Sequence, residues 1–114
     1  MHEGAIAESI LRVAMEATPK DRPKITRVTV VAGALSGVEN EPLLLWFGHL
    51  SKGTPAEGAT MVITRAAARL VCKDCRQRRD YDGAGPLDPR CAVCGSNVSL
   101  EGGDELYVES VEVE

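Results

Sequence analysis

Four cysteines form the clearest chemical pattern in this 114-residue chain. They make two Cys-x-x-Cys pairs with fifteen residues between the pairs: Cys72 and Cys75, then Cys91 and Cys94. This spacing is typical of a tetrahedral zinc site, because two intervening residues let one tight turn aim both thiolates at one ion. Four thiolates fill the coordination shell, so the pattern predicts structural rather than catalytic zinc. Gly95 follows the second pair and can take a positive φ where that turn closes.

Two other uses of the same cysteines are two disulfides or a thioredoxin-like redox pair. A redox Cys-x-x-Cys normally occurs alone, at a strand-to-helix junction of a βαβ unit. The sequence has two pairs and we identify no such unit in it. Because every cysteine then belongs to a metal pattern, we favour zinc and expect the reducing cytoplasm as the compartment.

A second possible metal site lies at the start of the chain, in Met1, His2 and Glu3. A free Met1 amine, the peptide nitrogen of His2 and its imidazole Nδ1 would form two fused chelate rings. Such a planar nitrogen set suits Ni(II) or Cu(II). By itself this pattern is weak, since a terminal histidine is most often simply solvated. The other histidine, His49, lies between Phe47 and Leu50, and we expect it to be a partly buried or surface helical residue.

Composition excludes several classes of protein. The net charge of −4 argues against general nucleic-acid binding, which needs a basic surface. No apolar run approaches the ~20 residues of a transmembrane helix, and Glu3 and Glu8 stand where a signal peptide would be basic and then apolar. We find no Ser/His/Asp set and no glycine-rich phosphate loop, and therefore expect no enzymatic activity. A short basic cluster, Arg76, Arg78 and Arg79, leaves open a zinc module that binds an acidic protein partner.

Two amphipathic helices are predicted. The first covers residues 5–17 and ends at Thr18-Pro19. Its expected apolar stripe consists of Ile6, Ile10, Val13 and Ala17. The second begins at Asn40 as N-cap and ends at Gly53 as C-cap. Its apolar residues recur at i, i+3, i+4 and i+7, and we expect the two largest, Trp46 and Phe47, in the core: Leu43, Trp46, Phe47 and Leu50.

Three strands are predicted, at residues 25–32, 59–66 and 105–114. In the last one the apolar alternation changes parity after Val108, which indicates a β-bulge or a change of buried face. We therefore predict an α+β fold, in which a three-stranded sheet with two helices carries an inserted zinc-ribbon-like module. The expected domains are residues 1–69 with 104–114, which would bind nickel, and an inserted four-cysteine zinc domain, residues 70–103.

The chain resembles the HypA/HybF family of hydrogenase maturation factors almost from end to end. The resemblance is carried by both cysteine pairs and by four further segments: 1–3, 28–36, 52–59 and 105–114. The chain departs from the family pattern at Gly4, where an apolar residue is usual, and at Arg76, where glycine is common. It also has Ala92 where proline is common and Asp104 where a basic residue is usual.

This resemblance implies a nickel metallochaperone for [NiFe]-hydrogenase assembly. Nickel cargo would bind through Met1, His2 and Glu3, and structural zinc through Cys72, Cys75, Cys91 and Cys94. The implied partners are a maturation GTPase and the hydrogenase large subunit, with no nucleic acid and no membrane, and the protein would be a cytoplasmic monomer or weak dimer. The alternative is a zinc-ribbon interaction module without nickel transfer.

Overall fold

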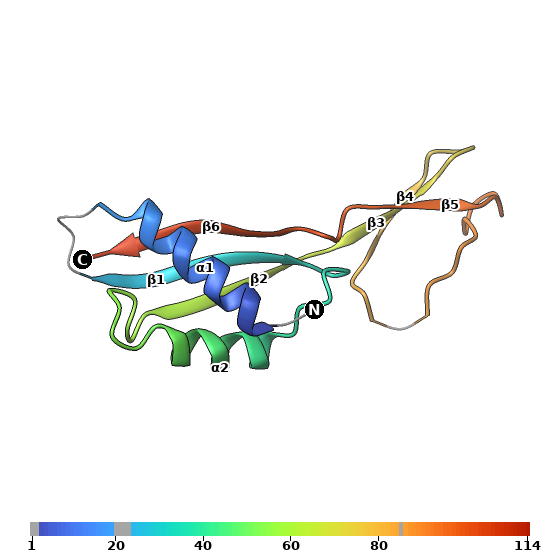
Figure 1. Cartoon of the computed structure of the whole chain (residues 1–114). Helices are drawn as coiled ribbons and strands as arrows, with labels where there is room; N and C mark the ends of the chain where they lie inside the picture. The colour runs from blue at the N-terminus through green and yellow to red at the C-terminus, as the bar shows by residue number, and fades with distance from the viewer. Residues whose placement is uncertain (1–2, 20–23, 85) are drawn as a thin grey trace.

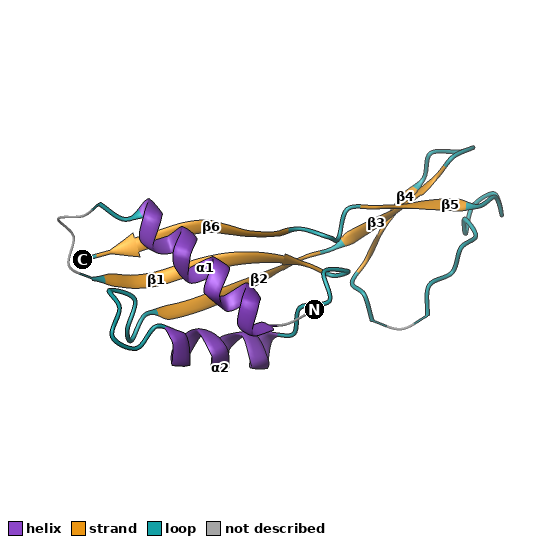
Figure 2. Ribbon diagram, viewed as in Figure 1, coloured by secondary structure: helices purple, strands orange, loops and turns teal. Residues whose placement is uncertain are grey.

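The computed structural model describes residues 3–19, 24–84 and 86–114, which form two three-stranded sheets joined end to end (Figure 1). The first sheet has the order β2-β1-β6: Thr60–Ala66, Ile25–Gly33 and Leu106–Val113. The second has the order β4-β3-β5: Arg78–Tyr81, Ala68–Cys72 and Val98–Glu101. Helices α1 (Glu3–Ala17) and α2 (Asn40–Leu50) cover the first sheet only (Figure 2). The predicted α+β fold with a separate cysteine module is confirmed.

The first sheet contains one feature that the sequence analysis got wrong. Strands β1 and β2 pair in parallel, with α2 as the crossover between them, so β1-α2-β2 is a βαβ unit where we expected none. Parallel neighbours require such a crossover connection. The cysteines lie outside this unit, in the other sheet and its turns, so the argument against a βαβ redox motif remains valid for a different reason.

Strand β6 pairs antiparallel with β1 and contains the predicted bulge. The register moves from Thr29 opposite Ser110 to Val30 opposite Val108, which skips Glu109. One extra residue in a strand exchanges the faces of the sheet to which the following side chains point. As a result, the four apolar residues of β6 all pack against the same core: Leu106, Val108, Val111 and Val113.

The helix ends differ slightly from the prediction. Helix α1 begins at Glu3, two residues earlier than expected, and ends at Ala17 as predicted. Helix α2 has Glu39 rather than Asn40 as its N-cap, and Ser51 rather than Gly53 as its C-cap. Gly53 instead takes a φ of +77° in the turn that follows. Neither helix in the described ranges is long and apolar enough to cross a bilayer.

The core lies between the helices and the first sheet. Phe47 is only 2% exposed, as predicted, but Trp46 is 46% exposed, so its placement in the core was wrong. Residues 43–47 are all apolar, and the packed face pairs Leu43 with Phe47 at i, i+4, which turns Trp46 outward. Helix α1 is also rotated from the predicted stripe. It buries Ala7, Ile10, Leu11 and Ala14, whereas Val13 and Ala17 are exposed.

Backbone contacts fix the junction between the sheets. The Ala34 N–H donates to the Ala66 carbonyl at 2.8 Å, and the Leu35 N–H donates to the Gly103 carbonyl at 2.6 Å. A Cβ at Gly33 would overlap the carbonyl of Gly103, so this close crossing of two chain segments requires glycine. The junction is therefore a packed crossing rather than a loose linker.

Candidate metal centre

The first cysteine turn follows directly from β3. Cys72 ends the strand, and its N–H donates to the Gln77 carbonyl at 2.9 Å. The Arg76 N–H returns to the Cys72 carbonyl at 3.1 Å, which closes the turn around Cys75. Arg76 has a φ of +63°, the left-handed region that favours glycine. Arg76 is one of the residues at which the chain departs from the expected pattern, and its backbone conformation is one that glycine adopts without strain.

The second cysteine turn repeats this arrangement. The Cys91 N–H donates to the Ser96 carbonyl at 2.7 Å, and the Gly95 N–H donates to the Cys91 carbonyl at 2.9 Å. Gly95 has a φ of +75°, which confirms the prediction made from its position after the second pair. The two turns therefore share one hydrogen-bond pattern and differ in the residue that adopts the positive φ.

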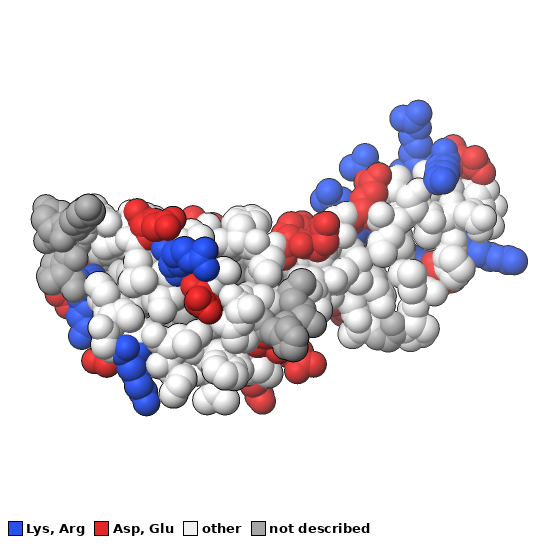
Figure 3. Space-filling model, viewed as in Figure 1, with Lys and Arg blue, Asp and Glu red and all other residues white. Residues whose placement is uncertain are grey.

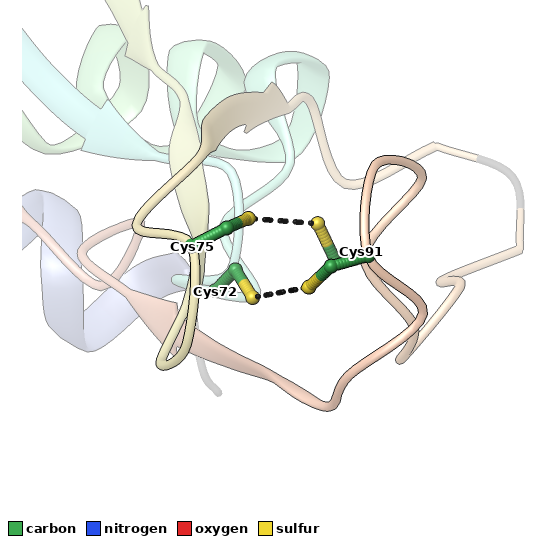
Figure 4. Close-up of side chains that lie close together, drawn as sticks. Cys72, Cys75 and Cys91 are labelled. Atoms are coloured by element: carbon green, nitrogen blue, oxygen red, sulfur yellow. Dashed lines mark hydrogen bonds between the residues drawn. The ribbon is translucent and has the colours of Figure 1, made fainter.

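The four thiol sulfurs converge between the two turns (Figure 4), and each of them lies within 4.8 Å of the others. Two Sγ–Sγ distances cross from one turn to the other, 3.4 Å for Cys72 to Cys94 and 3.5 Å for Cys75 to Cys91. A tetrahedral ion with Zn–S near 2.3 Å separates its sulfurs by about 3.8 Å, whereas a disulfide needs about 2.05 Å. All four cysteines are free, so the arrangement fits one tetrahedral metal ion and not two disulfides.

Backbone N–H groups act on these sulfurs unequally. In the second turn, the Ser96 N–H and hydroxyl lower the pKa of Cys94 to about 6. The N–H groups of Cys94 and Val93 lower the pKa of Cys91. In the first turn, the N–H of Gln77 lowers the pKa of Cys75, but desolvation and the neighbouring thiols outweigh it and raise the value to about 12.

On the face shown in Figure 3, several basic side chains project from this end of the molecule, with acidic side chains among them. Arg76, Arg78 and Arg79 are all exposed, and Arg79 donates to the Asp88 carbonyl at 3.0 Å. The predicted arginine cluster is thus a surface feature beside the cysteines.

Only part of the predicted N-terminal nickel set falls within the described structure. Met1 and His2 lie outside the described residues, whereas Glu3 begins α1 and is half-buried. His49 lies exposed on α2, with its ring centroid 6.3 Å from that of Trp46 in an edge-to-face arrangement. The structure therefore places His49 at the surface, one of the two environments expected for it.

The family model described as "Hydrogenase/urease nickel incorporation, metallochaperone, hypA" matches residues 1–113. This chain belongs to the HypA family. A HypA maturation factor of Azorhizobium caulinodans is 40% identical, with 99% of each chain covered. Another, from Caldanaerobacter subterraneus, is 34% identical over the whole of both chains. The solution structure of the nickel metallochaperone HypA from Helicobacter pylori is also similar, with a TM-score of 0.63 and 26% identity over 99% of this chain and 97% of that one.

Sequence analysis missed one contact next to the predicted nickel segment of this HypA chain. A Cβ built on Gly4 would lie 3.4 Å from two atoms of the Trp46 indole. Two separate features of the sequence relate to this contact. One is the glycine at residue 4, where an apolar residue was expected, and the other is the tryptophan in the apolar run on α2. Nothing in the sequence alone connects these two positions.

Proposed function

We propose that this protein is a nickel metallochaperone that binds Ni(II) at its N-terminus and delivers it for maturation of a [NiFe]-hydrogenase. The observation that carries the proposal is the family match over residues 1–113. The protein acts as a carrier rather than an enzyme, because transfer of an ion requires ligands that bind and release it and no group that makes or breaks covalent bonds in a substrate.

The proposed nickel ligands are the Met1 amine, the His2 peptide nitrogen and the His2 imidazole, with Glu3 completing the site. For Glu3 we propose the peptide nitrogen as the fourth donor. Two facts support this choice. Four nitrogens suit a planar, low-spin Ni(II) ion. Glu3 is the first residue of α1, and the first N–H groups of a helix have no partner within the helix.

The proposed zinc ligands are Cys72, Cys75, Cys91 and Cys94, in an inserted zinc domain of residues 70–103. Zinc there is structural, since four thiolates leave no open coordination position. The nickel-binding domain comprises residues 1–69 and 104–114. The two sites share no ligand, so either metal can be removed without touching the ligands of the other.

The proposed partners are the maturation GTPase and the hydrogenase large subunit, in the cytoplasm, with urease supply as a second destination. A transferred ion must come within coordination reach of donor and acceptor together. We therefore propose that partners dock on the nickel-binding domain near Glu3 and the start of α1, with the protein as a monomer or weak dimer. A GTPase pull-down with a variant lacking residues 72–94 tests this: retained binding supports it, and lost binding moves the interface to the zinc domain.

Nickel binding by untagged protein, with and without His2, tests the proposal. We expect one planar Ni(II) per chain in the unaltered protein and none in His2→Ala, with zinc content equal in both. His49→Ala is the matched control, since it removes the other histidine. A protein extended before Met1 loses the free amine and should lose the planar spectrum. Equal nickel binding by tagged and untagged protein would refute the N-terminal site.

If no form of the protein binds nickel while zinc is retained, the exposed arginine cluster favours the second candidate. This is a zinc-ribbon module that holds an acidic protein partner through Arg76, Arg78 and Arg79.

A further inference from the structure

The contact between Gly4 and Trp46 joins the first turn of α1 to the middle of α2. The two helices pack against each other, and the indole atoms Cδ2 and Cε2 lie 3.4 Å from the point where a Cβ of residue 4 would stand. At this distance a Cβ would be in van der Waals contact with the ring, so a side chain that extended further toward α2 would have to displace the indole. The space above residue 4 is therefore filled from α2.

This packing gives residue 4 an apolar neighbour although glycine has no side chain of its own. A glycine near a helix end weakens the first turn, because it costs up to about 1 kcal/mol relative to alanine. The Trp46 ring places apolar surface next to this glycine, although Trp46 remains half-exposed. The apolar surface next to residue 4 thus comes from α2.

We propose that Trp46 is a positioning residue for the nickel site, which it serves by holding the first turn of α1 in place. This inference rests on the proposed nickel function. His2 precedes Gly4 by two residues, so their Cα atoms are at most about 7 Å apart. Glu3, whose peptide nitrogen is the proposed fourth donor, is the first residue of that turn. A turn held by the indole leaves this nitrogen with less freedom to lose on binding the ion, and such preorganisation increases affinity.

The primary experiment measures nickel affinity and the planar Ni(II) absorption spectrum of untagged variants. Trp46→Ala should weaken binding by about tenfold, the lower end of what supporting residues contribute to a metal site. The double variant Gly4→Leu with Trp46→Ala should recover most of that loss, because leucine then supplies the missing contact from residue 4. Leu45→Ala is the matched control, since it removes a neighbouring apolar side chain of α2 that is 75% exposed. It should bind nickel normally.

A nickel-independent measurement keeps the inference separate from the proposed function. Trp46 is the only tryptophan, so the indole fluorescence reports on the surroundings of this one ring, which include Gly4 and His49. Gly4→Leu should displace the indole and shift its emission without any metal present, and nickel should quench the emission of the unaltered protein.

The outcomes then separate. Absence of nickel binding in the unaltered protein would overturn the proposed function. Normal binding in Trp46→Ala, or no recovery in the double variant, would overturn this inference alone. A merely structural role for Trp46 would lower the melting temperature and leave the nickel affinity unchanged, which would also overturn it.

Discussion

The two sheets are stabilised in different ways. The first is covered by α1 and α2 over a continuous apolar core that includes Phe47, Val28 and Val30. In the described part of the second sheet and its turns, the buried apolar side chains are Ala68, Leu70, Cys72 and Cys91, and two of these four are proposed metal ligands. Without the proposed zinc, the second region would therefore have almost no core. With the proposed zinc bound, one chain would combine a region that folds by burial with one whose fold depends on coordination.

The largest expected effect is loss of the second region when one of its ligands is removed. Cys91→Ser should release zinc and disorder residues 70–103, because structural zinc in small domains contributes on the order of 10 kcal/mol to folding. Residues 3–19 and 24–66 should remain folded on their own core. Amide NMR dispersion and zinc analysis measure both effects. Val93→Ser is the control, since it changes a 68% exposed residue in the same turn. Unchanged zinc in Cys91→Ser would show that the ligand assignment is wrong.

The second prediction concerns a substitution in the core of the first region. Phe47→Ala should destabilise the helices and first sheet by about 3–5 kcal/mol, because it removes a large buried side chain and leaves a cavity. Urea unfolding followed by tryptophan fluorescence measures this loss, and zinc release is followed in parallel. Leu45→Ala on the same helix should change stability by less than about 0.5 kcal/mol. If zinc release moves together with the fluorescence transition, the two regions unfold as one unit and the contrast between them fails.

A smaller effect concerns the pH dependence of nickel binding. The nitrogen ligands must lose protons to bind, so nickel affinity should fall as the pH drops through the imidazole range near ~6.5. Below that pH, each proton displaced costs about tenfold in affinity per pH unit. Isothermal titration between pH 8 and pH 5.5 measures nickel affinity against pH. His49→Ala is the control, and its affinity should fall with pH as steeply as that of the unaltered protein. A flat profile would exclude histidine from the site.

The smallest effect distinguishes the two cysteine turns. Arg76→Gly should stabilise the zinc-bound module by up to about 1 kcal/mol, because it removes a non-glycine residue from the left-handed region. Gly95→Ala should destabilise it by a similar amount. A Cβ at Gly95 would meet nothing within 4 Å, so this effect arises from the backbone alone. Competition with a zinc chelator measures both variants, and equal zinc retention in all three proteins would contradict the strain at Arg76.

Patterns local to the chain were predictable. Alternation gave the strands of the first sheet and the bulge in β6, and the cysteine spacing gave the convergence of four sulfurs. Features decided by packing between elements were not. The apolar run at residues 43–47 allows more than one buried face, and only contact with α1 and the sheet selects Phe47 over Trp46. The alternation of apolar and polar residues also does not indicate whether two strands run parallel or antiparallel, so the parallel pairing of β1 with β2 was missed. The contact of Trp46 with Gly4 depends on which face of α2 is buried, so it could not be predicted either.

The chain between β4 and the second cysteine turn, rich in glycine and proline, divides the molecule in an unusual way (Figure 1). Everything after it contributes one edge strand to each sheet, β5 beside β3 and β6 beside β1, together with Cys91 and Cys94. A protease that cut there would leave two fragments, each carrying half of the sulfur ligands. Zinc would then link two separate polypeptides. A chelator that removed this zinc would let the second sheet of the cleaved protein dissociate.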